Sequence, residues 1–216
     1  MNDYGRDISV YIIEDELLIC NILCEVIGSI KGCRLAGGTT NGLTALKEIS
    51  EIRPDIVFAD LKLNDENGFD LIERIKFKLP ETKVIILSGY CNRTLIGQAV
   101  KIGASAYLTK NIRIDYIAEA IRKVYNSSAF YIPDDIGFNF DDIITDLKLY
   151  PNHYTLTKRE KEILLLIVNE YSTRDIAEKL GISEKTVRNH KSHMMQKLNI
   201  KSDAGLIKYA YYMAYI

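Results

Sequence analysis

The chain has 216 residues, of which 47% are hydrophobic and 26% charged, with a formal net charge of −1. This is the composition of a soluble globular protein, and the length suits one large domain or two ordinary ones. No apolar run approaches the roughly 18 residues of a membrane span, and residues 1–7 lack the regions of a signal peptide.

Four cysteines are present: Cys20, Cys24, Cys33 and Cys91. They form no paired CxxC motif, and the chain has only three histidines, so we expect neither a structural zinc site nor a disulfide framework. Free thiols are typical of a reducing compartment, and we therefore expect a cytoplasmic protein.

Short apolar runs alternate with amphipathic stretches through residues 1–126. Four runs read as buried strands, at residues 8–13, 56–59, 84–87 and 106–109. Helical periodicity follows Asp15, begins again at Asp70 until Pro80 ends it, and returns over residues 116–124. The pattern predicts a doubly wound, flavodoxin-like α/β domain with a five-stranded parallel sheet.

A polar residue follows each of the four runs. These residues are Glu14 with Asp15, then Asp60, Ser88 and Lys110. Because the functional crevice of such a sheet lies outside the carboxyl ends of its strands, we expect them to converge at one edge.

The predicted cluster combines three carboxylates, a hydroxyl and an amine. Neighbouring carboxylates repel one another unless a cation intervenes, and a hard ion such as Mg2+ takes oxygen ligands. The lysine supplies positive charge to a phosphoryl group. Together these groups suit a site where a carboxylate attacks a phosphoryl donor and forms an aspartyl phosphate.

Residues 127–152 break the pattern and are interpreted as a linker. The stretch carries Pro133, Pro151 and five aspartates. Its apolar residues could also form a short docking helix; they are Ile143, Ile144, Leu147 and Leu149.

Residues 153–216 predict a small all-α domain. They hold 11 Lys and Arg against 7 Asp and Glu, a balance that suits a polyanion. A capping box at Thr157 and Glu160 starts the first helix, and Ser172 or Thr173 caps the second, which Gly181 stops. Ser183 caps the third helix, which runs to about Leu198. Ser202 caps the last helix, which runs to near Tyr215. The short connection at Gly181 predicts a helix-turn-helix.

The third helix carries the candidate DNA contacts. Arg188, Asn189 and Ser192 share one face, and Arg and Asn can each bond a base edge in two places. Lys185, Thr186 and Lys191 are candidates for phosphate contacts. Four apolar residues are expected in the core: Val187, Met194, Met195 and Leu198. For any one polar residue, a solvated helix face is the competing interpretation.

Residues 8–124 resemble the receiver domain of bacterial two-component response regulators. The features that carry the resemblance are the acid pair, Asp60, the loop from Asp60 to Gly68, Ser88 and Lys110. The resemblance implies that Asp60 accepts a phosphoryl group and that Glu14, Asp15, Asp60 and the Lys62 backbone carbonyl hold Mg2+. It also implies that Ser88 and Lys110 contact the phosphoryl group and that Tyr107 is an aromatic switch. Asn64 and Asn111 stand where proline is common in the family.

Residues 155–210 resemble a LuxR-type DNA-binding domain. The matching stretches are 156–164, 175–183 and 185–190, with Lys197, Leu198, Lys201 and Ser202. This chain departs from the family pattern at residues 169–171, where the family favours a turn with glycine. The two resemblances imply a transcriptional response regulator of the NarL/FixJ/LuxR class. Its expected partners are a sensor histidine kinase, double-stranded promoter DNA and a second copy in a homodimer.

Two other functions compete with this one. A Mg2+-dependent phosphohydrolase would need an acid two residues after its nucleophile, and Lys62 stands there, so we expect no enzyme beyond possible self-dephosphorylation. The alternative is a DNA-binding regulator whose receiver acts independently of phosphorylation.

Overall fold

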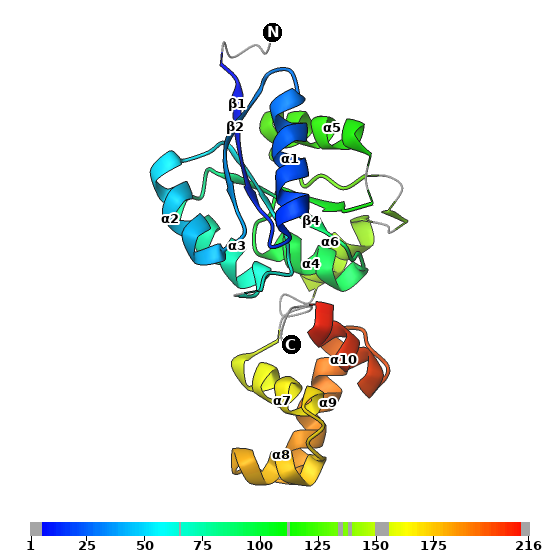
Figure 1. Cartoon of the computed structure of the whole chain (residues 1–216). Coiled ribbons are helices and arrows are strands. Elements are labelled where there is room, and N and C mark those ends of the chain that lie inside the picture. Colours follow the sequence, from blue (N-terminus) through cyan, green and yellow to red (C-terminus); the bar gives the residue numbers. More distant parts are fainter. Residues whose placement is uncertain are drawn as a thin grey trace. The chain divides into compact units, whose positions relative to one another are not determined.

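The computed structural model describes residues 6–64, 66–111, 113–133, 136–137, 140–149 and 156–212 (Figure 1). By their contacts the residues form two compact units, one of residues 1–92 and 99–138 and one of residues 93–98 and 139–216. Each unit is described by itself. Within the described ranges, every helix is too short or too polar to cross a bilayer.

The first unit is built on a parallel sheet in which strands and helices alternate along the chain. The five strands are β1 (Ile8–Ile13), β2 (Cys33–Thr39), β3 (Ile56–Ala59), β4 (Lys83–Ser88) and β5 (Ala106–Thr109). The helices between and after them are α1 (Leu17–Ser29), α2 (Gly42–Ile52), α3 (Gly68–Lys78), α4 (Arg93–Lys101) and α5 (Ile114–Asn126). Of α4, only residues 99–101 are grouped with this unit. The strand order is β2-β1-β3-β4-β5, with every pair parallel. The predicted doubly wound five-stranded sheet is confirmed.

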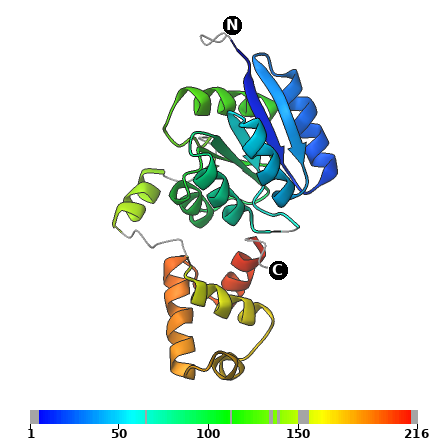
Figure 2. The ribbon, with the colours of Figure 1, turned by 90° about the vertical axis from the view of Figure 1, so that its left-hand side faces the viewer.

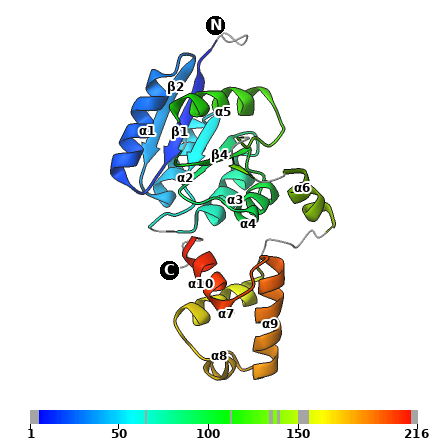
Figure 3. The ribbon, with the colours of Figure 1, turned by 90° about the vertical axis from the view of Figure 1, so that its right-hand side faces the viewer.

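Helices cover both faces of this sheet (Figures 2 and 3). On one face, Val10 and Ile12 of β1 pack in a buried cluster with Leu23 and Ile27 of α1 and with the apolar stripe of α5. All residues of β1 and β3 are buried, which explains why their sequences are continuous apolar runs and do not alternate.

The outer strands of the sheet differ from the central ones. β2 contains Gly37 and Gly38, and its pairing with β1 shifts register at Val10 and Tyr11. At the opposite edge, the Tyr107 N–H donates to the Tyr131 carbonyl over 3.1 Å, and the Tyr131 N–H donates to the Ser105 carbonyl over 2.9 Å. The start of the predicted linker therefore hydrogen-bonds along β5.

The second unit is helical (Figure 3). Its helices are α6 (Phe140–Leu149), α7 (Lys158–Val168), α8 (Thr173–Leu180), α9 (Glu184–Lys197) and α10 (Asp203–Tyr212). The capping box of Thr157 and Glu160 is formed as predicted, and Ser172, not Thr173, caps α8. Gly181 ends α8 with a φ of 62°, in the left-handed region that glycine tolerates. The predicted end of the last helix near Tyr215 lies outside the described residues.

The turn between α7 and α8 shows how this chain manages without the glycine that resembling domains favour there. Glu170 adopts a φ of 61°, a conformation that is strained for a residue with a Cβ. The Tyr171 N–H donates to the Leu166 carbonyl over 3.0 Å, which closes the turn. The chain keeps the turn geometry at the expense of some backbone strain.

Candidate functional site

Strand register places the predicted polar residues at one edge of the sheet. Ile13 pairs with Ala59 across β1 and β3, so Asp60 follows directly at that edge, and its N–H donates to the Ile13 carbonyl over 2.9 Å. Ser88 pairs with Thr109 in the same way, and the Lys110 N–H donates to the Ser88 carbonyl over 2.8 Å.

Three carboxylates meet at this edge. One oxygen each from Glu14, Asp15 and Asp60 lies within 4.8 Å of the other two. Glu14 is 1% exposed and Asp60 4% exposed, whereas Asp15 is half-buried. The cluster therefore has a buried base and a side open to solvent.

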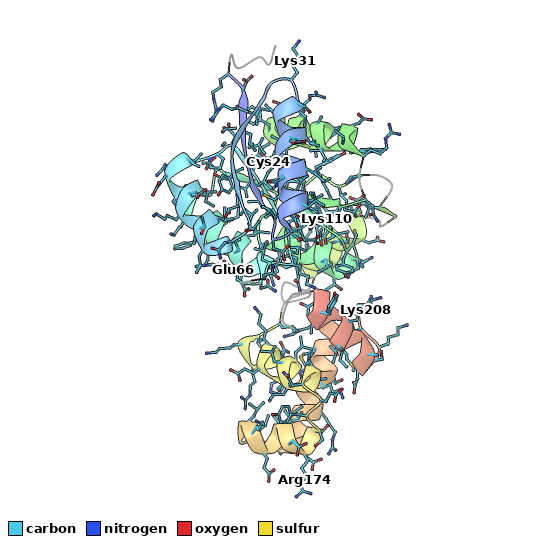
Figure 4. All side chains as sticks on the ribbon, viewed as in Figure 1. Cys24, Lys31, Glu66, Lys110, Arg174 and Lys208 are labelled. Carbon is cyan, nitrogen blue, oxygen red and sulfur yellow. The ribbon has the colours of Figure 1, made fainter. Side chains whose placement is uncertain are left out.

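Lys110 connects the two buried acids. Its Nζ donates to Glu14 Oε1 over 2.7 Å and to Asp60 Oδ2 over 2.8 Å, and Figure 4 shows it beside the N-terminal end of α1. Each bond joins two ionised groups, and such bonds are stronger than neutral ones. One cation thus neutralises part of the charge of two carboxylates.

Burial dominates the ionisation of the two buried acids. It raises the pKa of Glu14 to about 7, against the hydrogen bond from Lys110, and the charge of Asp60 adds to the rise. Burial also raises the pKa of Asp60, again opposed by Lys110. For Lys110, burial acts to lower the pKa, but its bonds to Asp60 and Glu14 outweigh burial and raise it. One lysine therefore does not fully offset the cost of ionising two buried acids.

The loop after Asp60 is held close to the acid. The Leu61 N–H donates to Asp60 Oδ1 over 2.6 Å, and Asn67 caps α3 by accepting from the Phe69 N–H over 2.9 Å. A Cβ on Gly68 would stand 2.4 Å from the backbone oxygen of Asp60, so only glycine fits there. The turn of Asn67 and Gly68 fixes the backbone around the acid.

Ser88 and Tyr107 meet in the loop after β4. Ser88 Oγ accepts from the Tyr90 N–H over 3.3 Å. The Tyr107 ring is fully buried and its hydroxyl donates to the Tyr90 carbonyl over 2.6 Å. Burial raises the pKa of Tyr107, against its hydrogen bond to Ser88. Tyr90 therefore joins the serine to the predicted switch residue.

The acid cluster is a donor set for a hard cation. All its donors are carboxylate oxygens, and one lysine leaves their charge partly uncompensated. Mg2+ takes such ligands and keeps waters in its remaining positions, so the residues present fit this ion. The role expected of the Lys62 carbonyl stays a prediction. The structure pairs Lys62 with Asn67 in an isolated antiparallel bridge.

The candidate DNA contacts lie on α9. Lys185, Arg188, Asn189 and Ser192 are exposed, whereas Thr186 and Lys191 are half-buried. The Thr186 hydroxyl lies 2.8 Å from that of Ser183, the N-cap of α9. Lys191 Nζ forms an ion pair of 2.5 Å with Asp203. Val187, Met194 and Leu198 are buried as predicted, whereas Met195 is half-buried.

Sequence reasoning missed two contributors to the site, Asn67 and Tyr90, whereas Gly68 was already part of the resemblance. Of the two, only Asn67 carries a local signal, because Asn67-Gly68 is a typical turn sequence. The contribution of Tyr90 is made by its backbone carbonyl, which no side-chain pattern reveals. The bonds of Tyr131 to β5 are likewise made by its backbone and could not be expected from its side chain.

Two family models match this chain. The response regulator receiver domain matches residues 10–122, and the luxR family of bacterial regulatory proteins matches residues 154–210. The matches cover the sheet with its acid cluster and the helices α7 to α10 with their candidate DNA contacts.

Similar proteins with both parts include regulators from several bacteria. The response regulator protein VraR of Staphylococcus saprophyticus is 29% identical over 94% of this chain and 96% of its own. The oxygen regulatory protein NreC of Staphylococcus carnosus is 33% identical over 79% of this chain and 81% of its own. The transcriptional regulatory protein MctR of Rhizobium johnstonii is 31% identical over 94% and 92%.

Solved structures share the fold. RcsB from Salmonella enterica serovar Typhimurium, bound to a promoter in the presence of the phosphomimetic BeF3−, matches with a TM-score of 0.71 and 18% identity over 96% of this chain and 99% of that chain. Another RcsB–DNA complex matches with a TM-score of 0.68 over the same shares of the two chains, also at 18% identity.

Proposed function

The chain belongs to the response regulators that join a receiver domain to a LuxR-type DNA-binding domain, and from that premise we propose that Asp60 accepts a phosphoryl group and thereby controls DNA binding. The observation that carries the proposal is the placement of Asp60: a nearly buried carboxylate that shares one lysine with a second buried acid, at the carboxyl edge of a parallel sheet. Parallel sheets bind their ligands at this edge.

The proposed transfer depends on Mg2+ and forms one bond to phosphorus while breaking another. An oxygen of Asp60 attacks the phosphorus of a phosphohistidine on a sensor kinase, an O–P bond forms, and the P–N bond breaks. The imidazole leaves and takes up a proton. Lys110 is placed to form an ion pair with the added phosphoryl group, because its Nζ already lies 2.8 Å from Asp60 Oδ2. Hydrolysis of the resulting acyl phosphate is the only turnover we propose.

Mg2+ is the ion that fits the cluster, with Glu14, Asp15, Asp60 and the Lys62 carbonyl proposed to hold it. When bound, it would neutralise charge on the transferring phosphoryl oxygens. The protein residues position the acceptor: the Leu61 N–H fixes one Asp60 oxygen at 2.6 Å, and Gly68 lets the loop approach the acid closely.

Ser88 and Tyr107 carry the proposed response to phosphorylation. Ser88 would hydrogen-bond a phosphoryl oxygen and draw the β4–α4 loop with it. The Tyr107 hydroxyl is bonded to the Tyr90 carbonyl of that loop, so any movement of the loop acts on the tyrosine. The loop and Tyr107 would thus have two arrangements, one before and one after phosphorylation, and the added charge would favour the second.

The C-terminal unit would bind promoter DNA through α9. We propose that Arg188, Asn189 and Ser192 face base edges and that Lys185, Thr186 and Lys191 contact phosphates, which position the helix. Because one such unit binds weakly, a homodimer reading two half-sites would raise the affinity. Dimers of RcsB bound to DNA are among the structures with this fold. A regulator of this kind works in the cytoplasm, where the DNA lies.

The test is phosphoryl incorporation from acetyl phosphate with Mg2+, followed by intact-protein mass. Wild type should gain one phosphoryl group and Asp60→Asn none. Asp55→Asn is the matched control, because Asp55 precedes the same strand at its other end, where it pairs with Arg6 and Ser9, and it should be labelled as wild type is. Equal labelling of Asp60→Asn would contradict the proposal. Absence of labelling in wild type would favour a regulator that acts independently of phosphorylation.

A further inference from the structure

A pair of thiols on α1 lies outside the acid cluster. Cys20 and Cys24 are one helical turn apart, and Figure 4 shows Cys24 on this helix. A Cβ placed on Gly38 of β2 would stand 3.0 Å from Cys24 Sγ and 3.5 Å from Cys20 Sγ. Both sulfur atoms therefore converge on one point of the β2 backbone.

The surroundings of the pair give it access to solvent. Cys20 is 4% exposed, but Cys24 is half-buried and Gly38 is exposed. Because Gly38 has no side chain, nothing from its own position covers the sulfur atoms. Cys24 is therefore the thiol of the pair that is open to solvent.

The geometry favours a bridging ion over a disulfide. Residues four apart on a helix hold their Cβ atoms about 5–6 Å apart, while a disulfide requires roughly 3.5–4.5 Å. An ion between the two sulfur atoms spans the longer separation without unwinding the helix. The pair can therefore act as a two-coordinate ligand while α1 stays intact.

Donor chemistry selects the ion. Thiolates prefer soft cations, and Cu(I) is one of these. Zinc normally takes four ligands in a tetrahedral shell, and within the described ranges the only group of three or more metal-binding side chains is the acid cluster. A two-sulfur site without a third protein ligand matches Cu(I), which binds two thiolates in a linear arrangement.

We propose that Cys20 and Cys24 bind one Cu(I) ion as thiolates beneath Gly38. Two Cu–S bonds form, two S–H bonds break, and both protons pass to solvent. The copper stays Cu(I) and the sulfur atoms stay thiolates, so no oxidant or reductant is required. The site is chemically distinct from the acid cluster, whose oxygen donors suit a hard ion.

The experiment titrates the full chain, reduced and without oxygen, with the Cu(I) complex of bicinchoninate. Wild type should withdraw one equivalent of Cu(I) from the coloured complex. Cys33→Ser and Cys91→Ser serve as matched controls and should also withdraw one equivalent. Cys20→Ser and Cys24→Ser should each withdraw none at the same chelator concentration. A Cys20→Ser/Cys24→Ser double variant that still takes up one equivalent would overturn the proposal.

A second measurement begins with wild-type protein. Wild-type protein is alkylated with iodoacetamide with and without one equivalent of Cu(I), and the modified peptides are identified by mass. Copper should protect Cys24 at least tenfold and leave the alkylation of Cys33 unchanged. Equal alkylation of Cys24 in both samples would contradict the site. Gly38→Ala should weaken Cu(I) binding because its Cβ crowds Cys24, whereas Gly89→Ala, which has open space around it, should not.

Discussion

Lys110 Nζ lies 2.8 Å from Asp60 Oδ2, although fifty positions separate the two residues in the chain. The same amine lies 2.7 Å from Glu14 Oε1. Two nearly buried carboxylates therefore share one cation, and burial raises the pKa of both acids against its effect. The lysine therefore holds the two acids together without fully offsetting the cost of burying their charge.

Removing the lysine should destabilise the receiver. Lys110→Gln leaves two buried carboxylates facing each other, and breaking a buried ion pair costs about 3–5 kcal/mol. We expect the free energy of unfolding to fall by an amount near the lower end of this range, since the lysine is partly exposed. Millimolar Mg2+ should restore part of that stability. Urea unfolding at neutral pH measures both effects. Lys47→Gln, on an exposed residue of α2, is the control, and equal stability of the two variants would contradict this role.

The stability of the second unit should depend on Glu160 and pH. Although burial acts to raise the pKa of Glu160, bonds from Lys197 and Thr157 lower it below its usual value of 4.5. An acid whose pKa is lower in the folded than in the unfolded state stabilises the fold when the pH is above its unfolded-state pKa. This stabilisation is lost as the pH falls through the folded-state pKa. Glu160→Gln should therefore cost about 2 kcal/mol at pH 7 and progressively less below pH 4.5.

The control for this pH dependence is Glu162→Gln. Glu162 pairs with Arg159 at the surface, and exposed pairs contribute at most about 1 kcal/mol. Thermal unfolding of both variants between pH 3 and pH 7 separates them. A Glu160→Gln deficit that stays constant over this range would rule out the ion pair as its cause.

Relieving the strained turn should stabilise the protein. Glu170 adopts a φ of 61°, so Glu170→Gly removes a Cβ from a left-handed conformation and should gain about 0.5–1 kcal/mol. Glu178→Gly is the matched change inside α8, where glycine should cost about 1 kcal/mol. Unfolding midpoints of the two variants should move in opposite directions, and a fall with Glu170→Gly would show that the turn is not strained.

Substitutions on α9 should separate sequence reading from general affinity. Arg188→Ala should cost about 1–3 kcal/mol on the preferred duplex and much less on unrelated DNA, because a base contact is lost. Lys185→Ala should weaken binding to all duplexes and reduce the salt slope by about one. Fluorescence anisotropy at several salt concentrations measures both. Equal losses on specific and unrelated DNA for Arg188→Ala would remove it from the base readers.

The buried strands and the capped helices could be predicted because their signals are local. β1 and β3 are wholly buried and so read as continuous apolar runs, and the caps at Thr157 and Ser183 satisfy helix ends within three residues. The polar residues at the strand ends followed from the parallel topology. Their exact placement depends on strand register, which the structure supplies by pairing Ile13 with Ala59 and Ser88 with Thr109.

Other features depend on contacts that the sequence does not display. β2 lies at the sheet edge and contains Gly37 and Gly38, so it has no apolar run to mark it. Tyr131 bonds to β5 through its backbone, and any residue type can make such bonds. Lys191, expected at DNA phosphates, forms an ion pair with Asp203, so it would have to leave this partner to reach a phosphate.

The most direct test of the central claim is DNA affinity before and after phosphorylation. A duplex selected from a random pool is titrated with wild type and Asp60→Asn, each with and without acetyl phosphate and Mg2+. The proposal predicts at least a tenfold gain in affinity for wild type and none for Asp60→Asn. An equal gain for both proteins, or no gain in wild type whose labelling at Asp60 is complete, would contradict control of DNA binding through this residue.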